Sequence, residues 1–170
     1  FVAASLLNFI RSTDAAIAAR QAMLSALQAR IRPHFLFNTL NTGAALVHAR
    51  PGEAEQLLLD LSDLFRAALS GDGEIPLVDE LALARRYLEI EALRFGPRLR
   101  LHWDLPDPMP DIRVPTLSIQ PLVENAIRHG VEPSAEGGAV DVRVVTDGQQ
   151  VKVIVANDLP RAGARVGPAH

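Results

Sequence analysis

The sequence predicts an α+β protein in which a helical hairpin precedes a mixed region of helices and strands. Three observations lead to this fold class. Helical periodicity dominates the N-terminal part, glycines at 71 and 73 interrupt the chain, and valines recur at every second position in 140–144 and 151–155. We therefore expect two regions, 1–72 and 73–170, with the helices of the second region packed on one face of its sheet.

The first region should begin with a long helix. Pro and Gly are absent from Ala3 to Arg30, and apolar residues recur at helical spacings, namely Leu6, Ile10, Ile17, Leu24, Leu27 and Ile31. The pattern continues past Pro33, which should interrupt or bend the helix, to an end near Arg50. In this last stretch the helical period puts Leu36, Leu40 and Val47 on one side and His34, Asn38 and Asn41 on the other.

A second helix should follow the Pro51-Gly52 turn and end before Gly71. Its apolar face consists of Leu57, Leu58, Leu61, Leu64, Phe65, Ala68 and Leu69. A single helical hairpin leaves such a face exposed. We therefore expect a parallel homodimer, a four-helix bundle formed through the faces Leu6–Val47 and Leu57–Leu69.

In the second region the sequence predicts a charged helix over Val78–Phe95 and a half-buried strand over Leu99–Asp104. A further helix is expected over Thr116–Gly130. The two valine runs that follow are joined by Asp147-Gly148, a dipeptide typical of strand hairpins.

Composition excludes several classes of function. A net charge of −3 does not fit a nucleic-acid surface, and the absence of Cys excludes disulfides and thiolate chemistry. The five His residues show no short metal-ligand spacing. The apolar run Phe1–Ile10 is too short to cross a bilayer, so it is either the end of an upstream membrane helix or the buried start of the long helix.

The first chemical motif is Arg-Pro-His at residues 32–34. A neutral imidazole nitrogen is a competent nucleophile toward a phosphoryl group. Asn38 lies one helical turn beyond His34, where its amide could orient a water for hydrolysis of a phosphorylated product. Taken alone, the motif is equally compatible with an ordinary exposed helix histidine.

The second motif is Gln-Pro-Leu-Val-Glu-Asn-Ala-Ile-Arg-His-Gly, residues 120–130. Its apolar residues supply a buried face, while its polar residues gather on other faces. Asn125 offers an oxygen ligand of the kind that Mg²⁺ prefers, and Arg128 suits a phosphate. Taken alone, it is equally compatible with an amphipathic helix that ends at Gly130.

The two motifs together resemble a known family. Residues 31–41 resemble the signature of LytS-like sensor histidine kinases, and residues 120–130 resemble the N box of that family. Between them, Tyr87–Glu91 and Leu93–Gly96 also look like the family. The resemblance covers roughly Leu27 to Asn157, and within the family it is nearest to the AlgZ-like sensors.

The resemblance implies a homodimeric bundle that carries His34 as phosphoacceptor, followed by an α/β-sandwich ATP-binding domain of the GHKL type. It implies ATP and Mg²⁺ as ligands, with Asn125 as the Mg²⁺ ligand and Glu124, Arg128 and His129 lining the nucleotide site. The phosphate would pass to an Asp in the receiver domain of a response regulator, in this family often one with a LytTR DNA-binding domain. It also implies the cytoplasmic portion of an inner-membrane protein, anchored through an upstream segment.

The sequence departs from the family pattern at three places. Phe35 follows His34 where many histidine kinases have an acid that serves as base, so Glu124 is the candidate base. Asn157 stands where an adenine-contacting Asp is expected, and Leu159 where a Gly is expected. The printed sequence ends at His170, before the glycine-rich box. An alternative function is therefore a pseudokinase or dimeric phosphotransfer scaffold that binds ATP poorly; an ATPase without a phosphohistidine is a further alternative.

Overall fold

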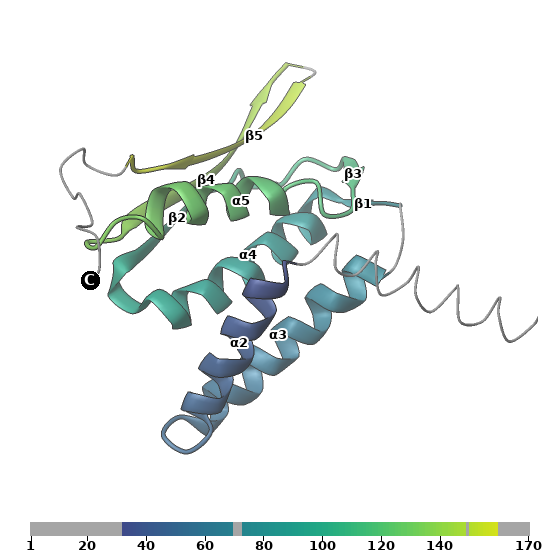
Figure 1. The fold of residues 1–170 in the computed structure, drawn as a ribbon. Helices are drawn as coiled ribbons and strands as arrows, with labels where there is room; N and C mark the ends of the chain where they lie inside the picture. The colour runs from purple at the N-terminus through teal and green to yellow at the C-terminus, as the bar shows by residue number, and fades with distance from the viewer. Residues whose placement is uncertain (1–31, 70–72, 149, 160–170) are drawn as a thin grey trace, which may run out of the picture. The chain divides into compact units, whose positions relative to one another are not determined.

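The structure is a computed structural model that describes residues 32–69, 73–148 and 150–159. The chain divides into two compact units, residues 1–37 and 38–170. The described part of the first unit, 32–37, contains the start of helix α2 (Pro33–Leu46) (Figure 1). The predicted helix over Ala3–Arg30 lies outside the described residues. In the described part of the chain, no helix has the length and apolar character needed to cross a membrane.

Helix α2 begins at Pro33, and Arg32 is not helical. Proline suits this first position because its missing N–H would have no partner within the helix. The chain buries Phe35, Thr39, Gly43 and Leu46 of this helix, whereas Leu40 and Val47 stay 45% and 48% exposed. The predicted end near Arg50 is wrong, because α2 ends at Leu46 and a hydrogen-bonded turn leads from there to the next helix.

Helix α3 (Pro51–Leu69) packs along helix α4 (Leu77–Phe95). This packing buries one part of the predicted apolar face of α3 and leaves the other part exposed. Leu57, Leu61, Leu64 and Ala68 are buried within the chain, whereas Leu58 and Leu69 remain 49% and 46% exposed. The full face is therefore not available to a partner, and assigning Leu57, Leu61 and Leu64 to dimerisation is wrong. Leu46 of α2 and Leu93 of α4 complete a small apolar cluster around Leu57.

Charged side chains also join α3 to α4. The guanidinium of Arg86 lies on the α4 side of this junction and pairs with the carboxylates of Asp63 and Asp60 on α3. The amide of Gln56 donates to Asp60 over 3.0 Å. These groups are partly exposed, so the apolar packing, rather than the ion pairs, supplies most of the stabilisation.

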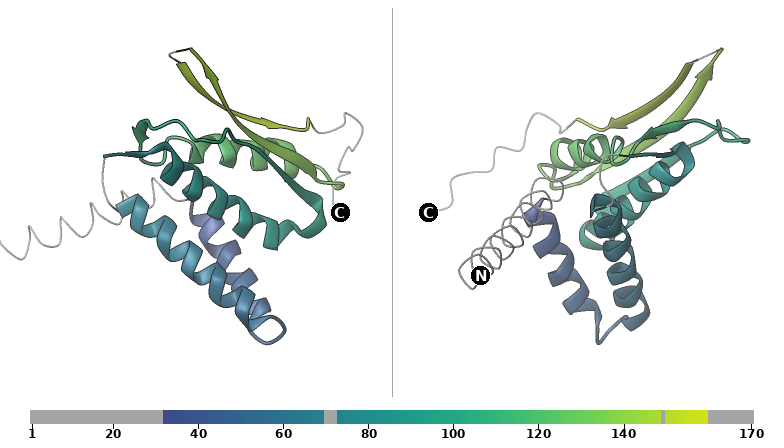
Figure 2. Two further views of the ribbon diagram at one scale, coloured as in Figure 1. Left: turned by 180° about the vertical axis from the view of Figure 1, so that it is seen from behind. Right: turned by 90° about the vertical axis from the view of Figure 1, so that its right-hand side faces the viewer.

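The second half of the chain contains a three-stranded sheet with the strand order β2-β4-β5. Strands β2 (Leu99–Asp104) and β4 (Gly138–Asp147) are parallel, and β4 and β5 (Gln150–Asn157) form the predicted antiparallel hairpin, with Asp147 opposite Gln150. Alternate residues of β4, from Gly138 to Val144, are buried. Helices α4 and α5 (Gln120–Ala126) lie over this face of the sheet, as predicted (Figure 2).

Two features of this half were not predicted. Short strands β1 (Glu74–Pro76) and β3 (Arg113–Pro115) pair antiparallel, and each has too few residues to show an alternating pattern. The helix expected over Thr116–Gly130 begins only at Gln120 and continues as a π-helical turn over Ile127–Val131. A start at Thr116 is excluded because Leu117 has a φ of 61°, which no α-helix accommodates.

Candidate functional site

The polar residues of the N-box-like segment share an exposed surface of α5 and the π-turn. Val123, Ala126 and Ile127 are buried beneath the sheet, while Asn125, Arg128 and His129 are exposed. Spacings of three and four residues bring these exposed side chains to one side of the helix. The sequence-predicted ligands therefore do share one surface, which we call the N-box face: Asn125, Arg128 and His129.

Two side chains of the N-box face, Asn125 and Arg128, are exposed. Within the described residues, neither the Asn125 amide nor the Arg128 guanidinium has a hydrogen-bond or ion-pair partner, so both can turn toward a ligand. Three or more His, Asp or Glu side chains do not converge as a metal cage anywhere in the described segments. The amide oxygen of Asn125 is a ligand of the kind that Mg²⁺ accepts.

Glu124 sits at the edge of the N-box face in a partly buried position. The amide of Gln120, one turn earlier and 3% exposed, donates to Glu124 Oε1 over 3.0 Å. The other amide atom, Gln120 Oε1, is buried without a hydrogen-bond partner. The orientation of the Glu124 carboxylate is thus set from below by a buried amide, a contact that the sequence did not reveal.

The end of the N-box segment meets the end of β5. A β-carbon at Gly130 would come within 2.5 Å of Asn157 Nδ2, so this glycine permits the close approach of the two segments. Asn157 donates to the backbone carbonyl of Asp158 over 2.9 Å. The Asp158 carboxylate in turn accepts from the Ala139 N–H over 2.8 Å and pairs with Arg100. Asn157 therefore lies next to the end of the N-box segment, and its role in nucleotide binding stays a prediction.

Helix α4 supports the N-box segment at its start through Glu80, a residue that sequence reasoning did not select. Glu80 is 0% exposed, and its two carboxylate oxygens accept hydrogen bonds from the backbone N–H groups of Leu117 and Ile119, over 2.8 and 2.9 Å. A signal was present, because Glu80 lies on the same face of the predicted helix as Leu77 and Ala84. An acid among buried apolar positions requires partners.

Helix α4 also holds the end of the N-box segment. The Arg94 guanidinium donates to Glu91 over 2.7 Å and to Glu132 over 3.0 Å, and Arg98 donates to the Ser134 carbonyl. Burial raises the pKa of Glu91, although Arg94 opposes the rise. Glu91 and Arg94 come from the segment Tyr87–Gly96 that resembles the family, which gives that resemblance a structural reason.

His34 occupies the second position of α2 and is exposed. Asn38 follows one turn later on the same helix and is partly buried. The backbone carbonyl of Asn38 accepts from the Thr42 hydroxyl over 2.9 Å, so the turn that contains it is fixed. An exposed histidine near a helix start is accessible to a second protein or to a nucleotide-loaded domain.

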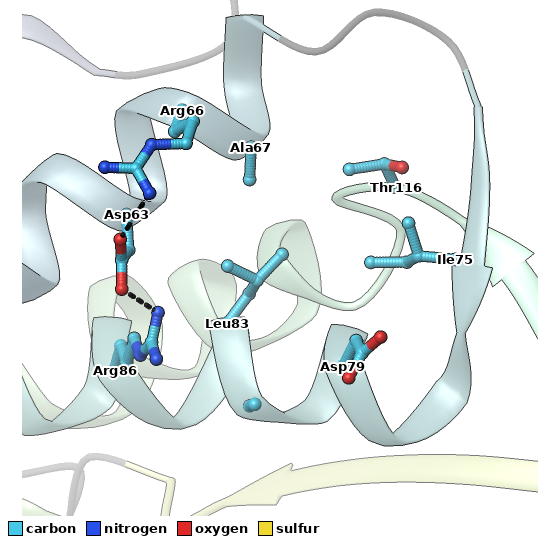
Figure 3. Close-up of a pocket in the computed structure, with 9 residues that line it drawn as sticks. Asp63, Arg66, Ala67, Ile75, Asp79, Leu83, Arg86 and Thr116 are labelled. Atoms are coloured by element: carbon cyan, nitrogen blue, oxygen red, sulfur yellow. Dashed lines mark hydrogen bonds and ion pairs between the residues drawn. The ribbon is translucent and has the colours of Figure 1, made fainter.

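A cavity of about 450 Å³ lies away from the N-box face, between α3, α4 and β1. Asp63 links Arg66 and Arg86 on one side of it, while Asp79 and Thr116 stand on the other (Figure 3). The sequence-predicted site residues do not line this cavity.

Comparisons with known proteins agree with the geometry. Residues 22–99 match the Histidine kinase family model. The chain is 40% identical over 139 residues to the sensor histidine kinase YpdA of Escherichia coli (strain K12), which covers 81% of this chain and 24% of YpdA. It is 39% identical over 142 residues to the sensor histidine kinase/phosphatase LytS of Staphylococcus aureus, which covers 82% of this chain and 24% of LytS.

The chain spans about a quarter of the length of these curated relatives. The matched regions include both motifs, and with them the exposed His34 of α2 and the α4 residues that contact the N-box segment. On this evidence the chain belongs to the LytS-like family of sensor histidine kinases.

Proposed function

We propose that this chain is the phosphoacceptor and nucleotide-binding part of a two-component sensor kinase that autophosphorylates on His34. The observation that carries the proposal is the N-box face. Asn125 and Arg128 are exposed there, and Gly130 at the end of the same segment lies close to Asn157 of β5. The names of the relatives support the same reaction class.

In the proposed reaction, an imidazole nitrogen of His34 forms a bond to the γ-phosphorus of ATP. The bond from that phosphorus to the bridging oxygen breaks, and ADP leaves with the electron pair. The imidazole gives up one proton, for which Glu124 is our candidate acceptor. Positioning and neutralisation of charge, rather than covalent chemistry by other side chains, supply most of the catalysis in phosphoryl transfer.

On the nucleotide side we assign one role to each residue of the site. Asn125 contributes an oxygen to the Mg²⁺ that accompanies ATP, and Arg128 neutralises phosphate charge. His129 and Asn157 line the site, with Asn157 on the adenine side. Bound Mg²⁺ would neutralise charge on the departing diphosphate.

The whole protein is proposed to act as a parallel homodimer with a boundary between its two regions at 72/73. Two exposed apolar stripes support dimerisation: Leu40 on α2 with Val47 directly after it, and Leu58 and Leu69 on α3. Their spacings of seven and eleven residues are typical of helices that pair in a bundle. The phosphate would pass from His34 to an Asp in the receiver domain of a response regulator, for which the LytTR type is our candidate. An upstream segment would anchor the protein in the inner membrane.

The test is phosphorylation of the full-length protein with radiolabelled ATP. Wild-type protein should acquire label that acid removes and alkali does not, as expected for a P–N bond. His34→Gln should abolish the label. His48→Gln is the matched control, because His48 is also exposed and lies just beyond α2; it should keep the label.

Acid-labile phosphate on the His34→Gln protein would refute the assignment. Calorimetry with Mg-ATP separates the alternative function from the main one. Full-length protein that accepts phosphate from a partner kinase but gives no heat with Mg-ATP would be a phosphotransfer scaffold.

A further inference from the structure

Glu80 is the most deeply buried acid in the described part of the chain, and its position is unusual for a carboxylate. It lies in the first turn of α4, 0% exposed, among Leu77, Leu81 and Ala84. Neither of its oxygens meets a cationic side chain among the hydrogen bonds of the described residues. Both instead accept from backbone N–H groups, of Leu117 over 2.8 Å and of Ile119 over 2.9 Å.

These two bonds fix the loop that leads into α5. Leu117 has a φ of 61°, a left-handed conformation that costs a non-glycine residue on the order of 1 kcal/mol and persists only where its surroundings enforce it. Ile119 is the residue directly before α5, whose first N–H groups have no partners within the helix. Glu80 satisfies the N–H of Ile119 and holds Leu117 in place.

The effect extends from the loop to the N-box face. Gln120 follows Ile119, is itself buried, and donates to Glu124 one turn further on. At the other end of the segment, Arg94 of α4 pairs with Glu132. Helix α4 therefore contacts the N-box segment near both of its ends, through Glu80 and through Arg94. Asn125 lies between these two contacts.

We propose that Glu80 is a positioning residue for the Mg-ATP site, which acts by fixing the start of α5 and hence the location of Asn125. This inference rests on the proposed function, because it assigns a role to Glu80 only if the N-box face binds the nucleotide. A carboxylate is required, since an amide would present N–H donors to at least one of the two backbone N–H groups.

The test uses the full-length protein with Glu80→Gln, and Glu89→Gln as matched control, because Glu89 is an exposed acid of the same helix. Both variants are first checked for a cooperative unfolding transition. At a temperature well below that transition, Glu80→Gln should weaken Mg-ATP binding about tenfold or more, as is typical when residues that orient a metal ligand are changed. Glu89→Gln should bind like wild type.

A double variant separates positioning from a purely structural role. If Glu80 acts through Asn125, then Glu80→Gln combined with Asn125→Ala should bind Mg-ATP no more weakly than Asn125→Ala alone. Fully additive losses would overturn the inference, and so would unchanged Mg-ATP affinity in a folded Glu80→Gln protein that has only lost stability.

Two further outcomes are informative. If Glu80→Gln does not fold, Glu80→Asp keeps the charge but shortens its reach, and it should show the same loss of affinity to a smaller degree; wild-type affinity in that variant would overturn the inference. Wild-type protein that binds no Mg-ATP would overturn the proposed function and this inference with it. Wild-type binding together with an unaffected Glu80 variant overturns this inference alone.

Discussion

Asn157 packs so closely on Gly130 that a β-carbon added to the glycine would lie 2.5 Å from Asn157 Nδ2 and 2.8 Å from Asn157 Cβ. This contact joins the end of the π-turn to the end of β5. It brings the position that the family resemblance assigns to the adenine side of the site next to the N-box segment. The glycine is required for its lack of a side chain.

Gly130→Ala should therefore lower both the free energy of unfolding and the affinity for Mg-ATP. The added methyl group forces Asn157 to move, and overpacking of this kind costs about 1–3 kcal/mol. Denaturant unfolding and calorimetry measure the two effects. Gly52→Ala is the control, since a β-carbon at this helical position meets no atom within 4 Å. A Gly130→Ala protein as stable as wild type would show that the contact is looser than described.

The sequence identified the apolar faces but could not tell which partner covers each one. Leu57 and Leu58 are neighbours in one apolar run, yet α4 buries the first and leaves the second exposed. Periodicity defines a direction on a helix, whereas the choice between burial within the chain and burial by a second chain depends on tertiary packing. The end of α2 and the start of α5 also differ from the predicted positions, and the left-handed φ of Leu117 explains the second difference.

For the candidate site too, the sequence predicted some of the residues and missed others. Asn125, Arg128 and His129 were predicted because exposed polar residues in a motif point directly to chemistry. Glu80 and Gln120 were missed because their contribution passes through buried hydrogen bonds to the backbone and to Glu124. The two bonds to Glu80 join segments far apart in the sequence, so a local pattern can mark a buried acid but does not identify its partners.

Dimerisation should depend on Leu58 rather than on the buried Leu61. Leu58→Glu places a charge in the proposed partner interface, where an unpaired charge costs several kcal/mol, so the dimer should dissociate. Light scattering of the full-length protein measures the change. Val145→Glu is the control, because Val145 is an exposed valine of β4 directly opposite Lys152, which can pair with the new acid. A Leu58→Glu protein that remains dimeric would exclude this stripe from the interface.

Because of Glu91, the free energy of unfolding should fall as the pH rises above the ordinary pKa of a glutamate. Burial raises its pKa in the folded state, so between about 4.5 and that higher value the folded protein holds a proton that the unfolded chain has released. Folding then binds protons, and the free energy of unfolding falls as pH increases through this window. Glu91→Gln removes the titrating group and should remove this part of the pH dependence.

Denaturant unfolding from pH 4 to pH 7 tests this expectation, with the stability of wild type compared with that of Glu91→Gln at each pH. Arg94→Gln provides the opposite change. The guanidinium of Arg94 lowers the pKa of Glu91, so its loss should raise that pKa further and extend the window upward. A wild-type advantage over Glu91→Gln that grows with pH would contradict the sign.

We expect Asn38 to act in the removal of phosphate from the response regulator rather than in the phosphorylation of His34. It lies on α2 four residues after His34, and on an α-helix such residues share a face. An amide at that distance can hold a water in line with a phosphoryl group on a receiver-domain Asp that docks against His34.

Asn38→Ala in the full-length protein should therefore leave labelling by ATP largely intact and slow the loss of phosphate from the response regulator by tenfold or more, the usual scale of a group that orients a reacting water. Asn41→Ala is the matched control, because Asn41 is an exposed asparagine of the same helix and should affect neither rate. Time courses with purified phosphorylated regulator, with and without ADP, distinguish hydrolysis from back-transfer to His34. If Asn38→Ala instead abolishes labelling while the helix content stays unchanged, Asn38 acts in the attack of His34 on ATP, and the division of labour between the two residues is wrong.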